Sequence, residues 1–141
     1  LREHLADVPG LTLPGDGPGS RHAWWKFAFH VDTGVVPGGA ARLGSAMRAA
    51  GVACVPRYIQ KPAFECELFR DWSKSPVTWL PLQHNPRREG PMPPFARADY
   101  PGAVQGLDDV VVLPINENYT AEHTAHIAAV IRSAVEANTV A

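Results

Sequence analysis

The run Val110–Leu113, four consecutive apolar residues closed by Pro114, constrains the fold more than any other part of the sequence. A continuous apolar run of this length is typical of a strand that is buried on both faces. Val52–Arg57 is β-branched and apolar enough to predict another short strand, which the prolines around its end would stop. Both strands require a layered fold in which other elements cover a sheet.

A further strand is predicted over residues 23–31. There Trp25, Phe27, Phe29 and Val31 alternate with other residues at the two-residue period of a strand. We therefore expect these four side chains on one face, against the core.

Helical periodicity marks three other segments. Ala40–Ala50 carries apolar residues at helical spacing and is followed by Gly51, a residue suited to ending a helix. Ala63–Trp72 has apolar residues every four positions, which predicts one buried stripe. Ala121–Glu136 is the clearest amphipathic helix, and Thr120 is placed to cap its first turn.

Proline and glycine divide the chain. Residues 1–19 comprise the end of a helix and a Pro/Gly-rich linker over 9–19, and residues 20–141 form one domain with a long Pro-rich loop at 73–106. The expected fold is therefore α+β with two layers: a small sheet of about three to four strands covered by helices.

Composition excludes several classes of protein. Hydrophobic residues make up 45% of the 141 positions, so the chain can form a core. A formal net charge of −1 gives no electrostatic field that would attract nucleic acid. No apolar run in the sequence is long enough to span a membrane. Two cysteines do not make a disulfide framework, which favours the cytoplasm. Because the first residue is Leu1, we expect a piece of a longer protein.

Two kinds of reactive site are poorly supported. The possible metal ligands are scattered rather than paired at the spacing of zinc motifs, and two histidines three positions apart lack a surrounding metal motif. We therefore predict no metal site. A nucleophilic cysteine with a histidine partner is open by sequence distance but has no positive support. The cysteines and histidines that could serve in such sites are Cys54, Cys66, His30, His84, His123 and His126.

The turn after the predicted strand 52–57 is the strongest candidate site. Arg57, Tyr58, Gln60 and Lys61 place a guanidinium, a phenol, an amide and an ammonium between two prolines. Such groups can bind the carboxylate, phosphate or ring of a polar ligand, and the alternative is a solvated strand end. A second polar cluster follows the last strand, where Asn116 and Tyr119 either belong to a secondary cleft or form the turn before the final helix.

In their order along the chain, several short motifs resemble the C-terminal small domain of the DegT/DnrJ/StrS sugar aminotransferases, which are fold type I pyridoxal-phosphate enzymes. They are Gly10-Leu-Thr-Leu-Pro14 before a strand, Ala50-Gly-Val52 after a helix, Arg57-Tyr58 in the turn, Val112-Leu-Pro114, and Thr120 before the terminal helix. Together they cover nearly the whole chain. Many members carry His-Tyr in the turn where this sequence has Arg57-Tyr58.

The resemblance implies transfer of an amino group from glutamate or glutamine to a keto-sugar, usually nucleotide-linked, or to a keto-cyclitol. It places the pyridoxal-phosphate lysine in a larger N-terminal domain and implies a homodimer with active sites at the subunit interface. This chain alone is then expected to bind no cofactor, to hold no catalytic residue and to be inactive, while Arg57, Tyr58, Gln60 and Lys61 line the substrate cleft.

Two other functions remain open on the residues alone. One is a standalone, non-catalytic module that binds a sugar or a partner protein, which a start codon just before Leu1 would favour. The other is a small hydrolase that uses Cys54 or Cys66 with a histidine.

Overall fold

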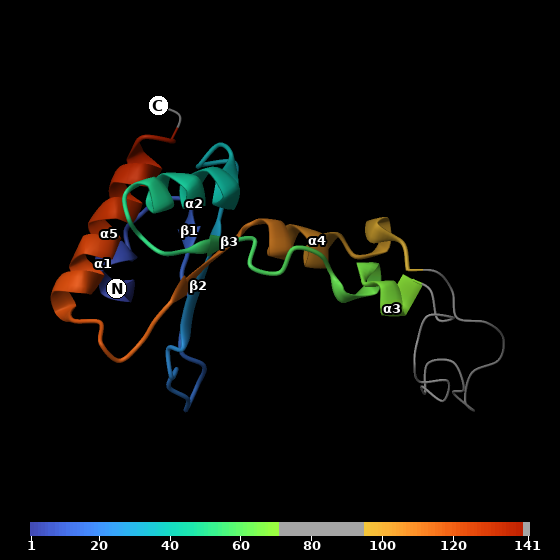
Figure 1. Ribbon diagram of the computed structural model, residues 1–141, viewed down its shortest axis with the longest axis horizontal. Coiled ribbons are helices and arrows are strands. Elements are labelled where there is room, and N and C mark those ends of the chain that lie inside the picture. Colours follow the sequence, from blue (N-terminus) through green and yellow to red (C-terminus); the bar gives the residue numbers. More distant parts are fainter. Residues whose placement is uncertain (71–94, 140–141) are drawn as a thin grey trace.

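The computed structural model describes residues 1–70 and 95–139, and these residues form an antiparallel sheet with helices packed on it (Figure 1). The sheet has four strands in the order β1-β2-β4-β3. The predicted α+β two-layer class is confirmed. In chain order the elements are α1 (Arg2–Leu5), β1 (Leu11–Thr12), β2 (Lys26–Val31), α2 (Gly39–Ala49), β3 (Val55–Pro56), the 3-10 helix η1 (Ala63–Glu65), α3 (Glu67–Arg70), the 3-10 helix η3 (Arg97–Asp99), α4 (Pro101–Asp108), β4 (Val110–Pro114) and α5 (Ala121–Glu136).

β4 lies between β2 and β3 and pairs antiparallel with both. Its central residues are buried on both faces: Val111 and Leu113 point into the main core, while Val112 lies at the register position between Ala28 and Val55. The apolar run therefore forms the interior strand that the sequence predicted.

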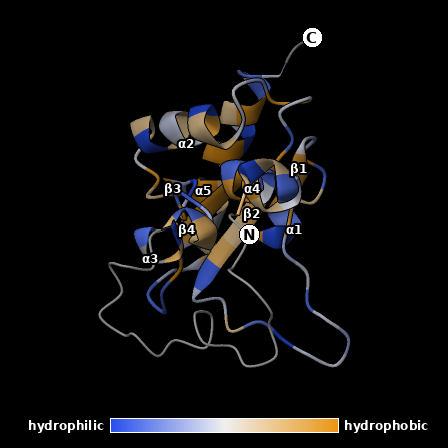
Figure 2. Cartoon of the chain, turned by 90° about the vertical axis from the view of Figure 1, so that its right-hand side faces the viewer, coloured by the Kyte–Doolittle hydropathy of each residue, from blue (hydrophilic) through white to orange (hydrophobic). Residues whose placement is uncertain are grey.

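The main core lies between one sheet face and the helices α2 and α5. Figure 2 shows hydrophobic residues concentrated in α5 and in the strands beneath α2. Burying large aliphatic and aromatic side chains stabilises a fold by about 1.5–3 kcal/mol each before ordering entropy is subtracted. The largest fully buried side chains come from α1, β2, the following loop, α2, β4 and α5: Leu5, Phe29, Val31, Val36, Leu43, Met47, Val111, Leu113, Ile131 and Val135.

Helix α5 begins with a reciprocal cap. The Thr120 hydroxyl accepts from the His123 backbone N–H, and the Thr120 backbone N–H donates to His123 Nδ1 at 3.0 Å. This is a capping box in which histidine takes the place usually held by Glu or Gln. Thr120 is the cap that the sequence predicted, and His123 completes it.

The aromatic face of β2 differs from the prediction at one position. Phe27, Phe29 and Val31 are buried as expected, but Trp25 is 76% exposed. Trp24 has a positive φ of 52°, which breaks the strand alternation just before Lys26. As a result Trp24, rather than Trp25, turns inward and packs on Phe27 with ring centroids 5.6 Å apart.

Other predicted boundaries also change. Within the predicted strand 52–57, only Val55–Pro56 pairs with another strand. The predicted linker 9–19 contains β1, which pairs with the end of β2. In the segment 63–72 the backbone of Cys66 is extended and divides η1 from α3. Residues 71 and 72 lie outside the described residues.

The predicted loop 73–106 is helical near its end. Its residues 73–94 lie outside the described part of the chain, but η3 and α4 fall within 95–106. Pro101 is the first residue of α4, where proline needs no hydrogen-bond partner and its fixed φ suits a helix. In Figure 1, α3 and α4 extend from the sheet on the side away from α1 and α5.

Candidate functional site

The turn that follows β3 is held in a specific shape by its backbone. Arg57 adopts a left-handed conformation with φ of 50°, and its N–H donates to the Val110 carbonyl at 2.8 Å. The Gln60 side-chain amide donates to the Arg57 carbonyl. A non-glycine residue in this region is strained, so these bonds help to fix the turn. Gln60 thus supports the turn from within.

Arg57 itself is bound to a carboxylate of its own chain. Its Nη2 lies 2.7 Å and its Nε 2.9 Å from Oδ1 of Asp108, at the end of α4. Arg97 Nη2 lies 3.9 Å from the other Asp108 oxygen and also forms an ion pair with Glu65. The predicted anion-binding guanidinium is therefore part of an ion-pair network that joins the turn to η1, η3 and α4.

Tyr58, the next residue in the turn, meets a residue that sequence reasoning did not select. Lys26, the first residue of β2, donates a hydrogen bond to the Tyr58 hydroxyl and lies 4.0 Å from the centroid of its ring. The same ammonium lies 4.2 Å from the centroid of the exposed Trp25 ring. We call Trp25, Lys26 and Tyr58 the aromatic–lysine cluster. The one available signal was the position of Lys26 on the polar face of its predicted strand.

The remaining predicted site residues are not all in one place. Lys61 is exposed, three positions beyond Tyr58. Asn116 and Tyr119 follow the end of β4, whereas Arg57 lies beside its beginning, at Val110. Asn116 Oδ1 accepts from the Asn118 N–H at 2.9 Å, and the Tyr119 N–H donates to the Asn116 carbonyl. These two residues thus form the turn that leads into α5.

The two cysteines differ in their surroundings. Cys54 is buried, its thiol donates to the Gly44 carbonyl at 3.4 Å, and burial raises its pKa. Cys66 is partly buried and His30 is exposed, while His84 lies outside the described residues. Within residues 1–70 and 95–139, no group of three His, Cys, Asp or Glu side chains is arranged to hold a metal ion.

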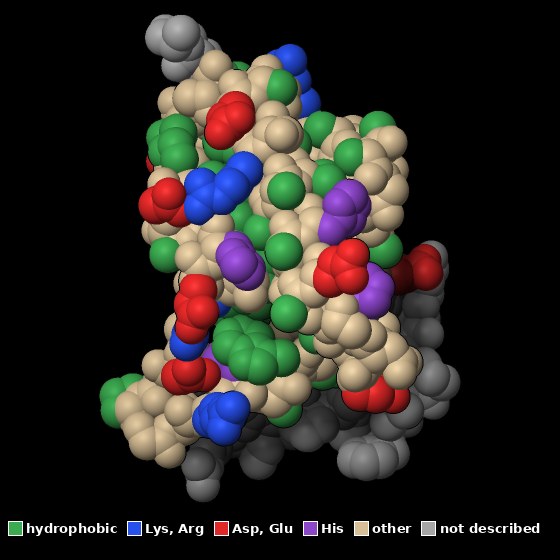
Figure 3. All heavy atoms as spheres, turned by 90° about the vertical axis from the view of Figure 1, so that its left-hand side faces the viewer, with side chains coloured by type: hydrophobic (Ala, Val, Ile, Leu, Met, Phe, Trp, Pro, Cys, Tyr) green, Lys and Arg blue, Asp and Glu red, His purple; other side chains and the backbone are tan. Residues whose placement is uncertain are grey.

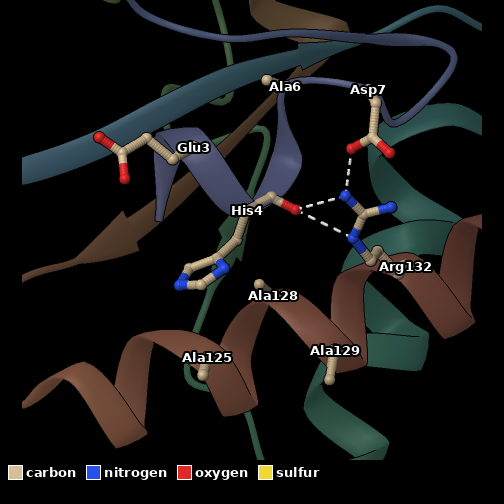
Figure 4. Close-up of a pocket in the computed structure, with 8 residues that line it drawn as sticks. All are labelled: Glu3, His4, Ala6, Asp7, Ala125, Ala128, Ala129 and Arg132. Atoms are coloured by element: carbon tan, nitrogen blue, oxygen red, sulfur yellow. Dashed lines mark hydrogen bonds and ion pairs between the residues drawn. The ribbon is translucent and has the colours of Figure 1, made fainter.

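A groove lies on the helical side of the molecule, away from the turn after β3. It lies between α1 and α5 and is lined partly by small residues such as Ala125, Ala128 and Ala129 (Figure 4). Arg132 spans it, donating to the His4 carbonyl and to the Asp7 carboxylate. Figure 3 shows acidic, basic and histidine side chains interspersed over this face. The groove is thus a contact between two helices, and its principal cation is already paired.

No protein-family model matches the chain, and no curated protein matches it. Among the described residues, no helix has the length and apolar character needed to cross a membrane.

Proposed function

We propose that the chain is the C-terminal small domain of a pyridoxal-phosphate aminotransferase that acts on a keto-sugar, most often nucleotide-linked, or a keto-cyclitol. The support is the order of the motifs, each of which falls at an element boundary. Gly10–Pro14 contains β1, Ala50-Gly-Val52 follows α2, Arg57-Tyr58 follows β3, and Val112-Leu-Pro114 ends β4.

The observation that carries the proposal is the difference between the two faces of the sheet. One face packs on α2 and α5, while the other carries Lys26, Ala28 and His30 of β2, of which Ala28 and His30 are exposed. Tyr58 lies over this second face through its bond to Lys26. Val112 of β4 is buried on this face, so the exposed groups are those of β2 and of the turn after β3. A sheet with one face covered by helices and exposed polar and aromatic groups on part of the other suits a domain that forms one wall of a cleft.

The described residues do not fit the cofactor. Pyridoxal phosphate supplies an electron sink and carries the amino group, and it requires a lysine for covalent attachment and an acidic partner for the ring nitrogen. Of the lysines in the described part of the chain, Lys26 is engaged with Tyr58 and Trp25, and Lys61 lies exposed just beyond the turn. The proposal therefore assigns cofactor binding to a larger upstream domain and to a homodimer interface.

If the upstream domain binds the cofactor, the role of the residues of this chain is to hold and orient the substrate. Tyr58 can donate or accept a hydrogen bond and present its ring to a sugar, because 44% of its surface is exposed. Arg57 acts as a positioning residue, since its guanidinium fixes the turn through Asp108. Lys61, exposed just beyond the turn, adds a cation at the rim of the cleft.

The proposal is tested by comparing this chain with the enzyme that also contains the upstream domain. The longer protein should bind pyridoxal phosphate, seen as a yellow absorbance band, and should transaminate keto-sugars. The isolated chain should do neither. A chain of 141 residues that turns yellow with cofactor and transaminates unaided would overturn the assignment.

Substitutions in the turn test its role in the same enzyme. Tyr58→Phe and Arg57→Ala should each raise KM for the keto-sugar, the first by losing the hydroxyl and the second by releasing the turn. Tyr100→Phe is a matched control, because Tyr100 is also partly exposed but stacks on Phe64, with ring centroids 4.9 Å apart. Unchanged kinetics for both turn variants would exclude the turn from the cleft.

The parent protein itself distinguishes the proposed aminotransferase domain from the alternative, a standalone binding module. The intact mass and coding sequence show whether a domain large enough to hold the cofactor precedes these residues. If translation starts immediately before Leu1, the module is favoured.

A further inference from the structure

The capping box of α5 contains a histidine at the position where glutamate or glutamine is usual. His123 Nδ1 lies 3.0 Å from the Thr120 backbone nitrogen and 2.9 Å from the Thr120 hydroxyl oxygen. A backbone N–H can only donate, so this geometry requires Nδ1 to be the unprotonated, accepting nitrogen of a neutral ring. The complete cap therefore exists in only one protonation state of the imidazole.

Protonation of His123 removes this acceptor. An imidazolium carries a hydrogen on both ring nitrogens, so Nδ1–H and the Thr120 N–H would point toward each other. The Thr120 hydroxyl can accept from the protonated nitrogen, so that contact can persist in either state. The bond from the Thr120 N–H has no such alternative, and the new positive charge lies at the end of the helix where the backbone dipole is already positive.

The first turn of α5 has few other side-chain contacts. Among residues 121–126 only Thr124 is half-buried and the others are exposed, and the first buried residue of the helix is Ile127. In many helices an apolar residue at the position of Thr124 packs against the residue before the cap. Here the Thr124 hydroxyl instead donates to the Ala121 carbonyl at 2.9 Å, within the same turn. The cap is thus the main side-chain interaction that holds this turn in place.

The charged groups around α5 do not replace the bond that protonation breaks. In the described part of the chain the His123 ring meets Thr120 and the ring of Tyr119, whose centroid lies 5.8 Å away. Glu117 and Glu122 are near in sequence and favour a positive ring, but both are exposed, so solvent and salt screen them. The charged and titratable side chains of α5, of the turn before it and of the helices α1 and α2 that pack against it are Glu117, Glu122, His126, Arg132, Glu136, Arg2, Glu3, His4, Arg42 and Arg48.

We propose that Thr120 and His123 form a pH-sensitive cap, which orders the first turn of α5 while the imidazole is neutral and releases it when the imidazole is protonated. Histidine is the side chain that ordinarily changes charge between about pH 5 and pH 8, whereas glutamine or glutamate at this position would keep the cap over that range. The released turn includes Thr124, which lines a cavity beside Trp24 and Phe27. The cap is built from this chain alone and is independent of the proposed enzymatic function.

The cap is tested by NMR of the isotopically labelled chain between about pH 8 and pH 5. The Thr120 amide signal should move together with the titration of the His123 ring, and the Cα shifts of residues 121–124 should move toward random-coil values. His123→Gln keeps an acceptor that does not titrate, so it should abolish both changes. His126→Gln is the matched control, because His126 is an exposed histidine of the same helix that lies outside the cap, and this variant should keep both changes.

Urea unfolding measures the consequence for stability. When the pH falls from about 8 to 5, the unfolding equilibrium constant of wild type should rise by about three- to tenfold more than that of His123→Gln, because wild type loses a cap bond and gains an unfavourable charge. The Asp7–Arg132 pair does not interfere in this range. The hydrogen bond from Arg132 holds the pKa of Asp7 below its ordinary value of 3.8, so the Asp7 carboxyl remains ionised throughout.

The result that supports the proposal is a Thr120 titration that disappears in His123→Gln and persists in His126→Gln. A Thr120 amide that does not follow the His123 ring, or that titrates equally in His123→Gln, would rule the proposal out. So would equal pH dependence of stability in wild type and His123→Gln. Loss of the Thr120 titration in His126→Gln would assign the effect to His126 and would also reject the cap as the switch.

Discussion

Arg57 and Asp108, separated by 51 positions in the sequence, form a two-point ion pair with Nη2–Oδ1 and Nε–Oδ1 distances of 2.7 and 2.9 Å. The pair joins the turn after β3 to the last residue of α4, two positions before β4 begins at Val110. It therefore links the strained backbone of Arg57, with φ of 50°, to the element that projects beside the sheet.

A double-mutant cycle on Arg57→Ala and Asp108→Asn should give a coupling free energy of about 0.5–1 kcal/mol in urea unfolding. The value is modest because both side chains are 41% exposed and water screens the pair. Arg57→Ala combined with Asp99→Asn, an exposed carboxylate that forms no ion pair within the described residues, should show no coupling. Equal coupling in the two cycles would contradict a specific Arg57–Asp108 interaction.

The sequence predicts the parts of the fold that local periodicity determines. β4, α5 with its Thr120 cap and the end of α2 at Gly51 were all predicted from nearby residues, because burial and capping act within a few positions. Trp25 was predicted wrongly, since the alternation rule assumes extended backbone and Trp24 departs from it.

The candidate site was predicted only in part. The turn at Arg57 and Tyr58 was recognisable from its clustered polar groups, but the partners Asp108 and Lys26 were not. They are 51 and 32 positions away, and no local pattern indicates which charges a sheet brings together. Whether Arg57 is available to a ligand depends on such a long-range partner, and sequence reasoning could not assess this.

Gly44 is expected to be intolerant of any side chain. It lies buried on α2, and a Cβ placed there would lie 2.7 Å from Cγ and 2.8 Å from Cβ of Pro56, on the edge strand β3. Because the proline ring cannot rotate away, Gly44→Ala should lower the free energy of unfolding by about 1–3 kcal/mol.

Gly106→Ala is the control for that substitution. Gly106 also lies within a helix, α4, but a Cβ there would meet nothing within 4 Å. Alanine is favoured over glycine in a helix interior, so this variant should be more stable by about 0.5–1 kcal/mol in the same urea experiment. Destabilisation of similar size in both variants would contradict a specific clash between Gly44 and Pro56.

The two thiols should react at different rates in the native protein. Cys54 is 7% exposed, and burial raises its pKa, so little reactive thiolate is available to a reagent. Cys66 is only partly buried. A chromogenic disulfide reagent at pH 8 should therefore label one thiol quickly and the second only after unfolding.

Cys66→Ser identifies the fast thiol, because this variant should lose the fast phase and keep the slow one. Loss of the fast phase in Cys54→Ser instead would contradict the burial of Cys54. Reaction much faster than that of an ordinary exposed cysteine would favour the hydrolase hypothesis, which requires an activated thiol.

The Arg132–Asp7 ion pair should make the attachment of α1 to α5 dependent on pH. The hydrogen bond from Arg132 lowers the pKa of the Asp7 carboxyl below its ordinary value of 3.8. A carboxyl whose pKa is lower in the folded state contributes its stabilisation above the unfolded value and loses it as the pH falls through the folded value. The Asp7 contribution is therefore complete at neutral pH and disappears in acid.

Asp7→Asn should accordingly have a lower urea midpoint than wild type at pH 7, and the two midpoints should converge as the pH falls well below 3.8. Arg132→Met supplies the control, because Asp7→Asn added to it has no ion pair left to remove and should change the midpoint little at either pH. A gap between wild type and Asp7→Asn that is as large in acid as at pH 7 would mean that the carboxylate charge does not hold α1 in place. The hydrogen bonds from Arg132 to the His4 carbonyl, which do not titrate, would then be the principal link between the two helices.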